Sequence, residues 1–363
     1  MTMKAGIITF HTAINFGAVL QSVALHKFLL KINLDNEIID YENDAFKRNY
    51  SPIQKGNNSI KNVIRFIFVT PKQRRKNEQF RDFITSNTKL SEHCSKEELR
   101  NIAKSYDLII TGSDQVFKSD LTDFDMSYFL DFVNETTKKC SYAASFGGFG
   151  LSLEHESAEL ELLRTFNRLS IREKTGVDYL NRHGIKSIQN VDPTLLLSSD
   201  DWKKLSNAPK DEDYILLYTL GKGQHVEKTI KSANELAKRC KKKILYLNDS
   251  FRISTDFKFI RYSSPELFIG LFSNASTVVT NSFHGTAFSI IFHKEFYTNF
   301  NMPENKGTRI ESLLKLTGIE QNDFDYAIMH RNSLYIDWAE VDRRLDVERK
   351  NAEEYFKTII ENI

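Results

Sequence analysis

Residues 280–288 read Thr-Asn-Ser-Phe-His-Gly-Thr-Ala-Phe, and apolar runs flank them at 275–279 and 287–292. This pattern predicts a buried strand, a tight turn and a buried helix. The turn would place His284, hydroxyl groups and backbone N–H groups at a helix N-terminus, which favours anions. Because a histidine changes charge near neutral pH, the turn could bind a phosphate and move protons. A histidine that only caps its own helix is an equal alternative.

The N-terminal segment predicts the opening of a βα unit. Residues 5–10 are apolar enough for a buried strand, and the polar loop after them contains His11, Asn15 and Gly17. Apolar residues from 19 to 28 then follow helical spacing. A strand, a loop and a helix in this order are typical of α/β domains.

Two further segments deliver polar residues to predicted strand ends. The apolar strand at 107–111 continues into Gly112, Ser113 and Asp114, and a second short apolar stretch is followed by Arg172. Ligands of open α/β sheets bind at the carboxyl ends of the strands. We therefore expect these side chains to face the same edge of one sheet.

The length of 363 residues predicts two domains. We place an N-terminal α/β domain at 1–185 and a C-terminal α/β domain at 190–335. Within the second domain, a strand, a helix and a strand between 214 and 248 predict a βαβ unit with a right-handed crossover. Residues 336–363 have the apolar stripe of a long amphipathic helix.

The composition predicts a soluble cytoplasmic enzyme. The formal net charge of +2 argues against bulk nucleic-acid binding. No apolar run reaches ~18 residues, and the chain enters a core strand almost at once, so we expect neither a transmembrane helix nor a signal peptide. Cys94, Cys140 and Cys240 are scattered, which argues against disulfides and structural zinc.

Residues 47–83 form a basic segment, in which ten Lys or Arg face only Glu78 and Asp82. The segment also contains an apolar stretch at 63–69 and the cluster Arg74-Arg75-Lys76. Basic and aromatic residues together suit the inner face of a membrane or a diphosphate-linked acceptor. A solvated insertion that packs its apolar part on the domain is the alternative.

Taken together, these segments resemble the polysaccharide pyruvyl transferase family. The resemblance runs in order from the first strand to about Leu316, and its most specific pieces are residues 15–21, 111–117, 170–173, 192–194 and 283–285. It implies two Rossmann-like domains arranged as in GT-B glycosyltransferases, with a C-terminal helix packing back on the first domain. It also implies phosphoenolpyruvate as donor, a glycan or lipid-linked sugar as acceptor, no cofactor, and a pyruvate ketal on a surface glycan such as an exopolysaccharide or capsule.

A pyruvyl transfer needs an acid, a base and binding groups for a carboxylate and a phosphate. The resemblance gives proton transfer first to His284, with Asp114 and His11 as candidates for activating the sugar hydroxyl. The residues expected to bind the donor or the acceptor are Arg172, Ser282, Phe283, Gly285, Arg309, Asn15, Gly17, Gln21, Gly112 and Ser113. Several of these have a structural alternative, since Asp114 could cap a helix, Asn15 and Gly17 could form a turn, and Arg309 could be a surface charge.

This chain departs from the family pattern at Ser282, where many members carry an arginine that is expected to hold the phosphate. Arg172 and Arg309 are the residues expected to compensate, because a guanidinium binds carboxylate or phosphate at two points. Two other functions stay open. One is a GT-B glycosyltransferase that uses a nucleotide sugar, and the other is a non-catalytic glycan-binding relative.

Overall fold

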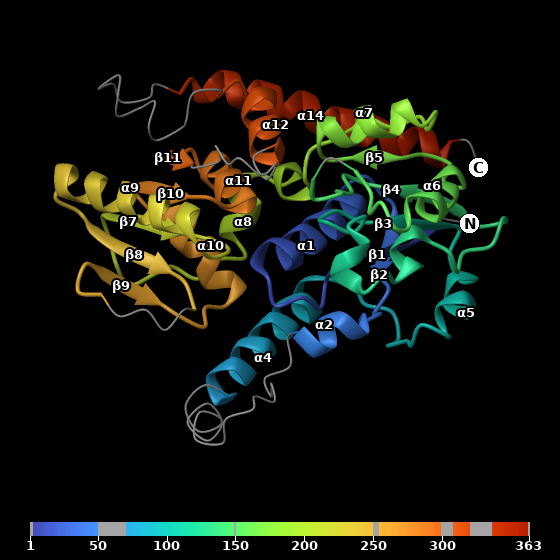
Figure 1. The fold of residues 1–363 in the computed structure, drawn as a ribbon, viewed down its shortest axis with the longest axis horizontal. Coiled ribbons are helices and arrows are strands. Elements are labelled where there is room, and N and C mark those ends of the chain that lie inside the picture. The colour runs from blue at the N-terminus through green and yellow to red at the C-terminus, as the bar shows by residue number, and fades with distance from the viewer. Residues whose placement is uncertain are drawn as a thin grey trace. The chain divides into compact units, whose positions relative to one another are not determined.

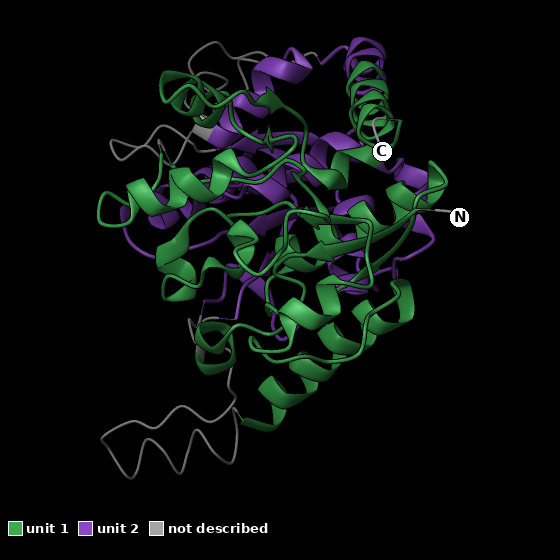
Figure 2. Ribbon diagram, turned by 90° about the vertical axis from the view of Figure 1, so that its right-hand side faces the viewer, with its two compact units in different colours: residues 1–196, 347–363 green, residues 197–346 purple. Residues whose placement is uncertain are grey.

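The computed structural model describes residues 3–49, 70–148, 150–249, 254–298, 308–319 and 336–361 (Figure 1). The chain forms two compact units, which are residues 1–196 with 347–363 and residues 197–346 (Figure 2). Each unit is built around its own parallel sheet.

Unit 1 contains four parallel strands in the order β2-β1-β3-β4. The strands are β1 (Lys4–Ile8), β2 (Asp35–Ile38), β3 (Leu108–Thr111) and β4 (Lys138–Ser141). A short parallel pair, β5 (Ser170–Ile171) and β6 (Ile188–Gln189), adjoins β4 through single bridges. Strand β3 is buried at every position, as expected for a parallel strand covered on both faces.

The helices of unit 1 follow the strands in βα order. They are α1 (Phe16–Lys31), α2 (Asp44–Asn49), α4 (Thr70–Asn87), α5 (Leu99–Ala103), α6 (Glu156–Arg164), α7 (Lys174–Arg182) and the 3₁₀ turns η2 (Ser119–Thr122), η3 (Met126–Phe129) and η4 (Pro193–Leu196). Helix α1 begins at Phe16, inside the predicted loop, because the side chain of Asn15 accepts the N–H of Gly17 at 2.9 Å and caps the helix there. It packs against β2, α4 and η4.

Helix α4 carries most of the described part of the basic segment, and Lys47 and Arg48 lie in α2. Residues 50–69, including the predicted apolar stretch, lie outside the described residues. Arg74 and Arg75 are exposed. Lys76 is buried instead, with Nζ 5.3 Å from the ring centroids of both Phe16 and Phe80. The expected three-residue basic cluster is therefore divided, because two aromatic faces attract the Lys76 ammonium inward.

Helix α14 (Trp338–Ile360), drawn in red in Figure 1, ends within unit 1. There the Tyr355 hydroxyl donates to the Ser141 carbonyl at 2.7 Å, and the Phe356 ring stacks on Tyr142 at 5.2 Å. The predicted C-terminal helix that packs back on the first unit is confirmed.

Unit 2 contains five parallel strands in the order β11-β10-β7-β8-β9. The strands are β7 (Tyr214–Tyr218), β8 (Lys243–Leu247), β9 (Phe257–Ile260), β10 (Thr277–Thr280) and β11 (Glu295–Thr298). The helices are α8 (Ser199–Lys203), α9 (Gln224–Cys240), α10 (Pro265–Asn274), α11 (Phe283–Ile291) and α12 (Thr308–Thr317). The predicted βαβ unit corresponds to β7, α9 and β8, and the predicted α/β class is confirmed in both units.

Candidate functional site

The carboxyl edge of the unit 1 sheet gathers the polar residues that follow its strands. Arg172 follows β5, and its Nη1 donates to Asp192 Oδ2 at 2.8 Å. Ser113 follows β3, and its hydroxyl donates to the Ala143 carbonyl at 2.7 Å and lies 3.3 Å from Asp192 Oδ2. The strand ends thus converge, as parallel topology requires.

Arg172 is held by carboxylates of its own chain. Its side chain is 2% exposed, and Asp114 Oδ1 lies 3.7 Å from Nη2. Burial alone would lower the Arg172 pKa, but the charges of Asp192, Asp114 and Glu173 raise it above its ordinary value. The sequence predicted a donor contact for Arg172, whereas the structure commits its guanidinium to internal ion pairs. Donor binding by Arg172 stays a prediction.

Asp114 adopts a left-handed backbone conformation with φ +74°. Its carbonyl accepts the Ser145 N–H at 2.9 Å, and its side chain remains 13% exposed. Such a conformation costs about 1–3 kcal/mol in a residue other than glycine and is concentrated at functional sites. Nearby, a Cβ on Gly112 would meet Thr9 Cβ at 2.9 Å, so the ends of β1 and β3 approach too closely for any other residue.

The β1–α1 loop is tied to its helix. Asn15 caps α1, and Gly17 supplies one of the capped N–H groups. Gln21 is fully buried, and its Nε2 donates to Thr9 Oγ1 at 2.9 Å and to the Ala18 carbonyl at 2.8 Å. These three predicted acceptor contacts therefore hold the loop in place, and a direct contact with the acceptor stays a prediction.

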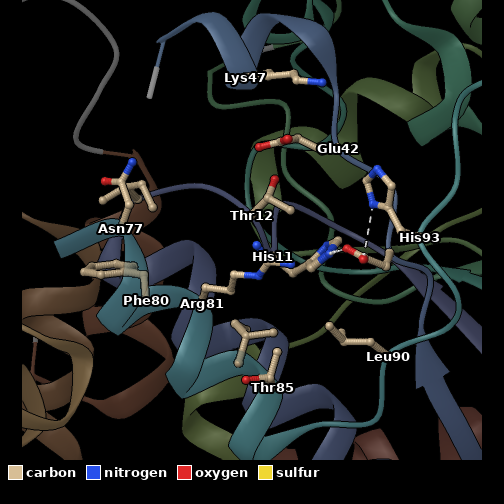
Figure 3. A pocket seen from close by; sticks show the side chains of 13 residues that line it. His11, Thr12, Glu42, Lys47, Asn77, Phe80, Arg81, Thr85, Leu90 and His93 are labelled. Atoms are coloured by element: carbon tan, nitrogen blue, oxygen red, sulfur yellow. Dashed lines mark hydrogen bonds and ion pairs between the residues drawn. The ribbon is translucent and has the colours of Figure 1, made fainter. Parts of the chain in front are cut away.

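His11 lies in a cavity of about 530 Å³ within unit 1 (Figure 3). Its Nε2 is 3.1 Å from Asp40 Oδ1 and its Nδ1 is 3.2 Å from the Thr9 carbonyl. Asp40 Oδ2 also contacts His93 Nδ1 at 3.2 Å. The hydrogen bond from His11 holds the Asp40 pKa below its usual range.

Asp40 and His93 are site residues that sequence reasoning missed. Asp40 comes two residues after β2 ends at Ile38, and Asp114 comes three residues after β3 ends at Thr111, so a comparable strand-end signal was available. His93 carries no comparable signal, because only the fold brings it to Asp40 from a distant loop.

In unit 2, β10, the turn and α11 appear where they were predicted. Ser282 is the N-cap, and its hydroxyl accepts the Gly285 N–H at 3.3 Å. His284 occupies the first turn of α11, is 8% exposed, and has its ring edge-to-face with Phe283 at 5.2 Å. A Cβ on Gly285 would lie 2.4 Å from Thr280 Oγ1, so glycine lets α11 approach the end of β10.

The residue before this cap, Asn281, fastens the neighbouring loop. Its side-chain Oδ1 accepts the Leu220 N–H at 2.8 Å, and its Nδ2 donates to the Leu220 carbonyl at 3.0 Å. Leu220 precedes Gly221 and Gly223, which both have positive φ. Arg309 is half-buried in α12, which packs against α11, and its role in donor binding stays a prediction.

Within the described ranges, no cluster of three or more His, Cys, Asp or Glu side chains is arranged to hold a metal ion. Among the helices that the structure describes, none is both long and apolar enough to cross a membrane.

A model of the polysaccharide pyruvyl transferase family matches residues 15–298. Similar solved structures include UDP-GlcNAc 2-epimerase from Neisseria meningitidis bound to UDP-GlcNAc, at 12% identity and a TM-score of 0.53, covering 99% of this chain and 100% of that chain. Another is S. aureus MnaA with UDP, at 10% identity and a TM-score of 0.54, covering 99% and 98%. At these identities the likeness establishes the GT-B fold alone. A comparison with curated protein sequences found no match.

Proposed function

This chain belongs to the polysaccharide pyruvyl transferase family, and we propose that it transfers pyruvate from phosphoenolpyruvate to two hydroxyls of a sugar as a ketal. The observation that carries the proposal is the family match over residues 15–298. The His284 turn supports it, because a buried imidazole at a helix N-terminus can move a proton beside a bound anion.

The reaction joins one phosphoenolpyruvate and one sugar diol and releases phosphate. Protonation of the methylene carbon makes the central carbon electrophilic, and the first hydroxyl adds to it. The second hydroxyl then displaces phosphate as both hydroxyl protons leave. The protein must therefore deliver a proton to carbon, accept protons from oxygen and neutralise the leaving phosphate.

We assign the proton on carbon to His284 and give Ser282 and the first turn of α11 the task of binding the donor anion. Arg309 is assigned to the donor as well. In unit 1, Asp114 is the candidate for accepting a hydroxyl proton, since its carboxylate is partly exposed at the carboxyl edge of the sheet. The Arg172–Asp192 ion pair links the segments that follow β5 and β6 at that edge. We therefore assign Arg172 mainly to positioning these segments.

We also propose that the enzyme works in the cytoplasm, at the inner face of the membrane, where a lipid-linked acceptor would be presented. The exposed residues Arg74 and Arg75 of α4 support this placement. Basic side chains on a protein surface attract anionic lipid by about 1 kcal/mol each.

The direct test is phosphate release from phosphoenolpyruvate with a panel of short-chain lipid diphosphate sugars. Our proposal predicts that phosphate appears only when one of the sugars is also present. Nucleotide sugars form the second arm of the panel. Transfer from a nucleotide sugar without use of phosphoenolpyruvate would instead identify a glycosyltransferase, and sugar binding without turnover of any donor would identify a binding protein.

A further inference from the structure

The cavity around His11 is lined by carboxylates, by apolar side chains and by cations. The predicted catalytic role of His11 does not account for this combination. The walls of the cavity come from the β1–α1 loop, the segment after β2, helices α2 and α4, and the loop that carries His93 (Figure 3). With about 530 Å³ it lies within the usual range of small-molecule sites.

The first kind of lining is a fixed acceptor of hydrogen bonds. The Asp40 side chain is 22% exposed and sits between His11, which is 2% exposed, and His93, which is 68% exposed. His11 contacts Oδ1 and His93 contacts Oδ2, and the partly exposed Asp40 side chain lines the cavity. A carboxylate held in this way can accept hydrogen bonds from hydroxyl groups.

The arrangement suits binding better than proton transfer. Both ring nitrogens of His11 are engaged by Thr9 and Asp40, so the ring has no nitrogen left for a substrate proton. The Asp40 pKa is held low, chiefly by the hydrogen bond from His11, which makes its carboxylate a weak base. We therefore place His11 among the residues that position Asp40.

The second kind of lining is apolar, and the third is cationic. Phe80 and Ile84 of α4 and Leu90 form an apolar wall, which suits the carbon face of a sugar ring. Lys47 and Arg81 also line the cavity, and both are exposed. Glu42 adds a carboxylate to the same lining, so a phosphate would be bound by the two cations away from it.

We propose that this cavity binds the acceptor as a glycosyl phosphate or diphosphate, with the sugar hydroxyls on Asp40 and the phosphate on Lys47 and Arg81. The inference rests on the proposed function, since it names the acceptor class of that reaction and the residues that select it. Selectivity follows from the pairing of the two subsites. A free sugar lacks the phosphate, and phosphoenolpyruvate lacks the ring hydroxyls.

The test measures binding by calorimetry with glucosyl, galactosyl, N-acetylglucosaminyl and N-acetylmannosaminyl phosphates, beside the free sugars, inorganic phosphate and phosphoenolpyruvate. At least one glycosyl phosphate binds the wild type more tightly than its free sugar and than inorganic phosphate. For that probe, Asp40→Asn weakens binding by about tenfold or more, as expected when hydrogen bonds to a charged group are lost. The Lys47→Ala/Arg81→Ala variant binds the glycosyl phosphate no better than the free sugar.

One control and one further cavity variant keep the result specific. Arg100→Ala removes an exposed arginine of α5 outside the cavity and leaves the affinity unchanged. His93→Ala changes an exposed side chain and weakens binding of the glycosyl phosphate even if Asp40→Asn fails to fold. Phosphoenolpyruvate affinity is the same in all these variants.

The inference is overturned if no glycosyl phosphate binds, if the cavity variants bind the probe as the wild type does, or if the Lys47→Ala/Arg81→Ala variant loses phosphoenolpyruvate instead. The proposed function fails separately, when the wild type releases no phosphate from phosphoenolpyruvate with any acceptor. If the cavity variants turn over with the acceptor KM of the wild type, the proposed function stands and the acceptor binds outside this cavity.

Discussion

Arg172 and Asp192 form a buried ion pair with a separation of 2.8 Å, and their side chains are 2% and 0% exposed. The pair joins the segments that follow β5 and β6. Asp192 Oδ1 also accepts the N–H and the hydroxyl of Thr194, at 3.0 and 2.7 Å. The carboxyl edge of unit 1 is therefore organised around one carboxylate with several donors.

The first prediction is that Arg172→Met lowers the free energy of unfolding by about 3–5 kcal/mol, because it leaves the Asp192 charge buried without its partner. Asp192→Asn has a comparable effect. In the double variant the buried Arg172–Asp192 pair is removed as a unit, so its loss is smaller than the sum of the two single losses, although Asp114 and Glu173 still lose the neighbouring guanidinium. Urea denaturation of the four proteins measures this coupling. A loss below about 1 kcal/mol in Arg172→Met, typical of a surface pair, would contradict the structural role.

The second prediction concerns the close approach of α11 to β10. Gly285→Ala places a Cβ 2.4 Å from Thr280 Oγ1, which itself donates to the Tyr218 carbonyl at 2.7 Å. We expect a loss of about 1–3 kcal/mol from overpacking. Thr280→Ala removes the clashing atom, so the double variant loses less than the two single losses together. Gly148→Ala, where a Cβ would meet no atom within 4 Å, is the matched control and stays near wild type. Strict additivity in thermal denaturation would argue against the close contact.

The third prediction is a pH dependence that comes from Asp40. Its pKa is held below the ordinary 3.8 by the hydrogen bond from His11 and by the charges of His11 and His93. A depressed pKa stabilises the folded state above the unfolded pKa, and this contribution disappears as the pH falls through the folded pKa. The stability difference between wild type and Asp40→Asn should therefore be fullest near about pH 5 and shrink toward about pH 2. Urea denaturation at several pH values provides the comparison, and a constant difference over that interval would refute the linkage.

The fourth prediction separates the exposed from the buried cations of α4. Arg74→Gln/Arg75→Gln should weaken binding to phosphatidylserine vesicles, by about 1 kcal/mol for each charge, and added salt should weaken the binding of the wild type. Lys76→Met should leave vesicle binding unchanged, because Lys76 is buried against Phe16 and Phe80. Vesicle sedimentation measures all three. Equal binding by the Arg74→Gln/Arg75→Gln protein and the wild type would remove this helix from the proposed membrane contact.

Much of the fold could be predicted from local pattern. The strand before His284 and the helix after it depend on apolar runs, which are readable along the chain. Local patterns suffice in these places because the interactions join residues that are close in sequence. The cap of that helix is Ser282, whereas the sequence suggested His284 for this role. For Asn15 the sequence suggested a turn or an acceptor contact, and its capping of α1 was found only in the structure.

The electrostatics of the site could not be predicted in this way. Arg172 was expected to contact the donor, yet its partners Asp114 and Asp192 lie 58 and 20 residues away along the chain and meet it only at the sheet edge. The contact between Asp40 and His93 was missed for the same reason, because it depends on the path of the loop after α4. A pattern shows which side chains reach an edge, but the fold decides which of them pair.

The measurement that bears most directly on the central claim compares wild type with His284→Asn, each given carbon-13-labelled phosphoenolpyruvate and the acceptor panel, with products followed by mass spectrometry. The account predicts that the wild type adds labelled pyruvate less one water to a sugar. It also predicts that His284→Asn melts within a few degrees of the wild type while its turnover falls about 10²- to 10⁴-fold, the usual contribution of a positioned acid or base. Near-normal turnover by folded His284→Asn would contradict the catalytic assignment, and the absence of labelled pyruvate in every wild-type product would contradict the proposed function itself.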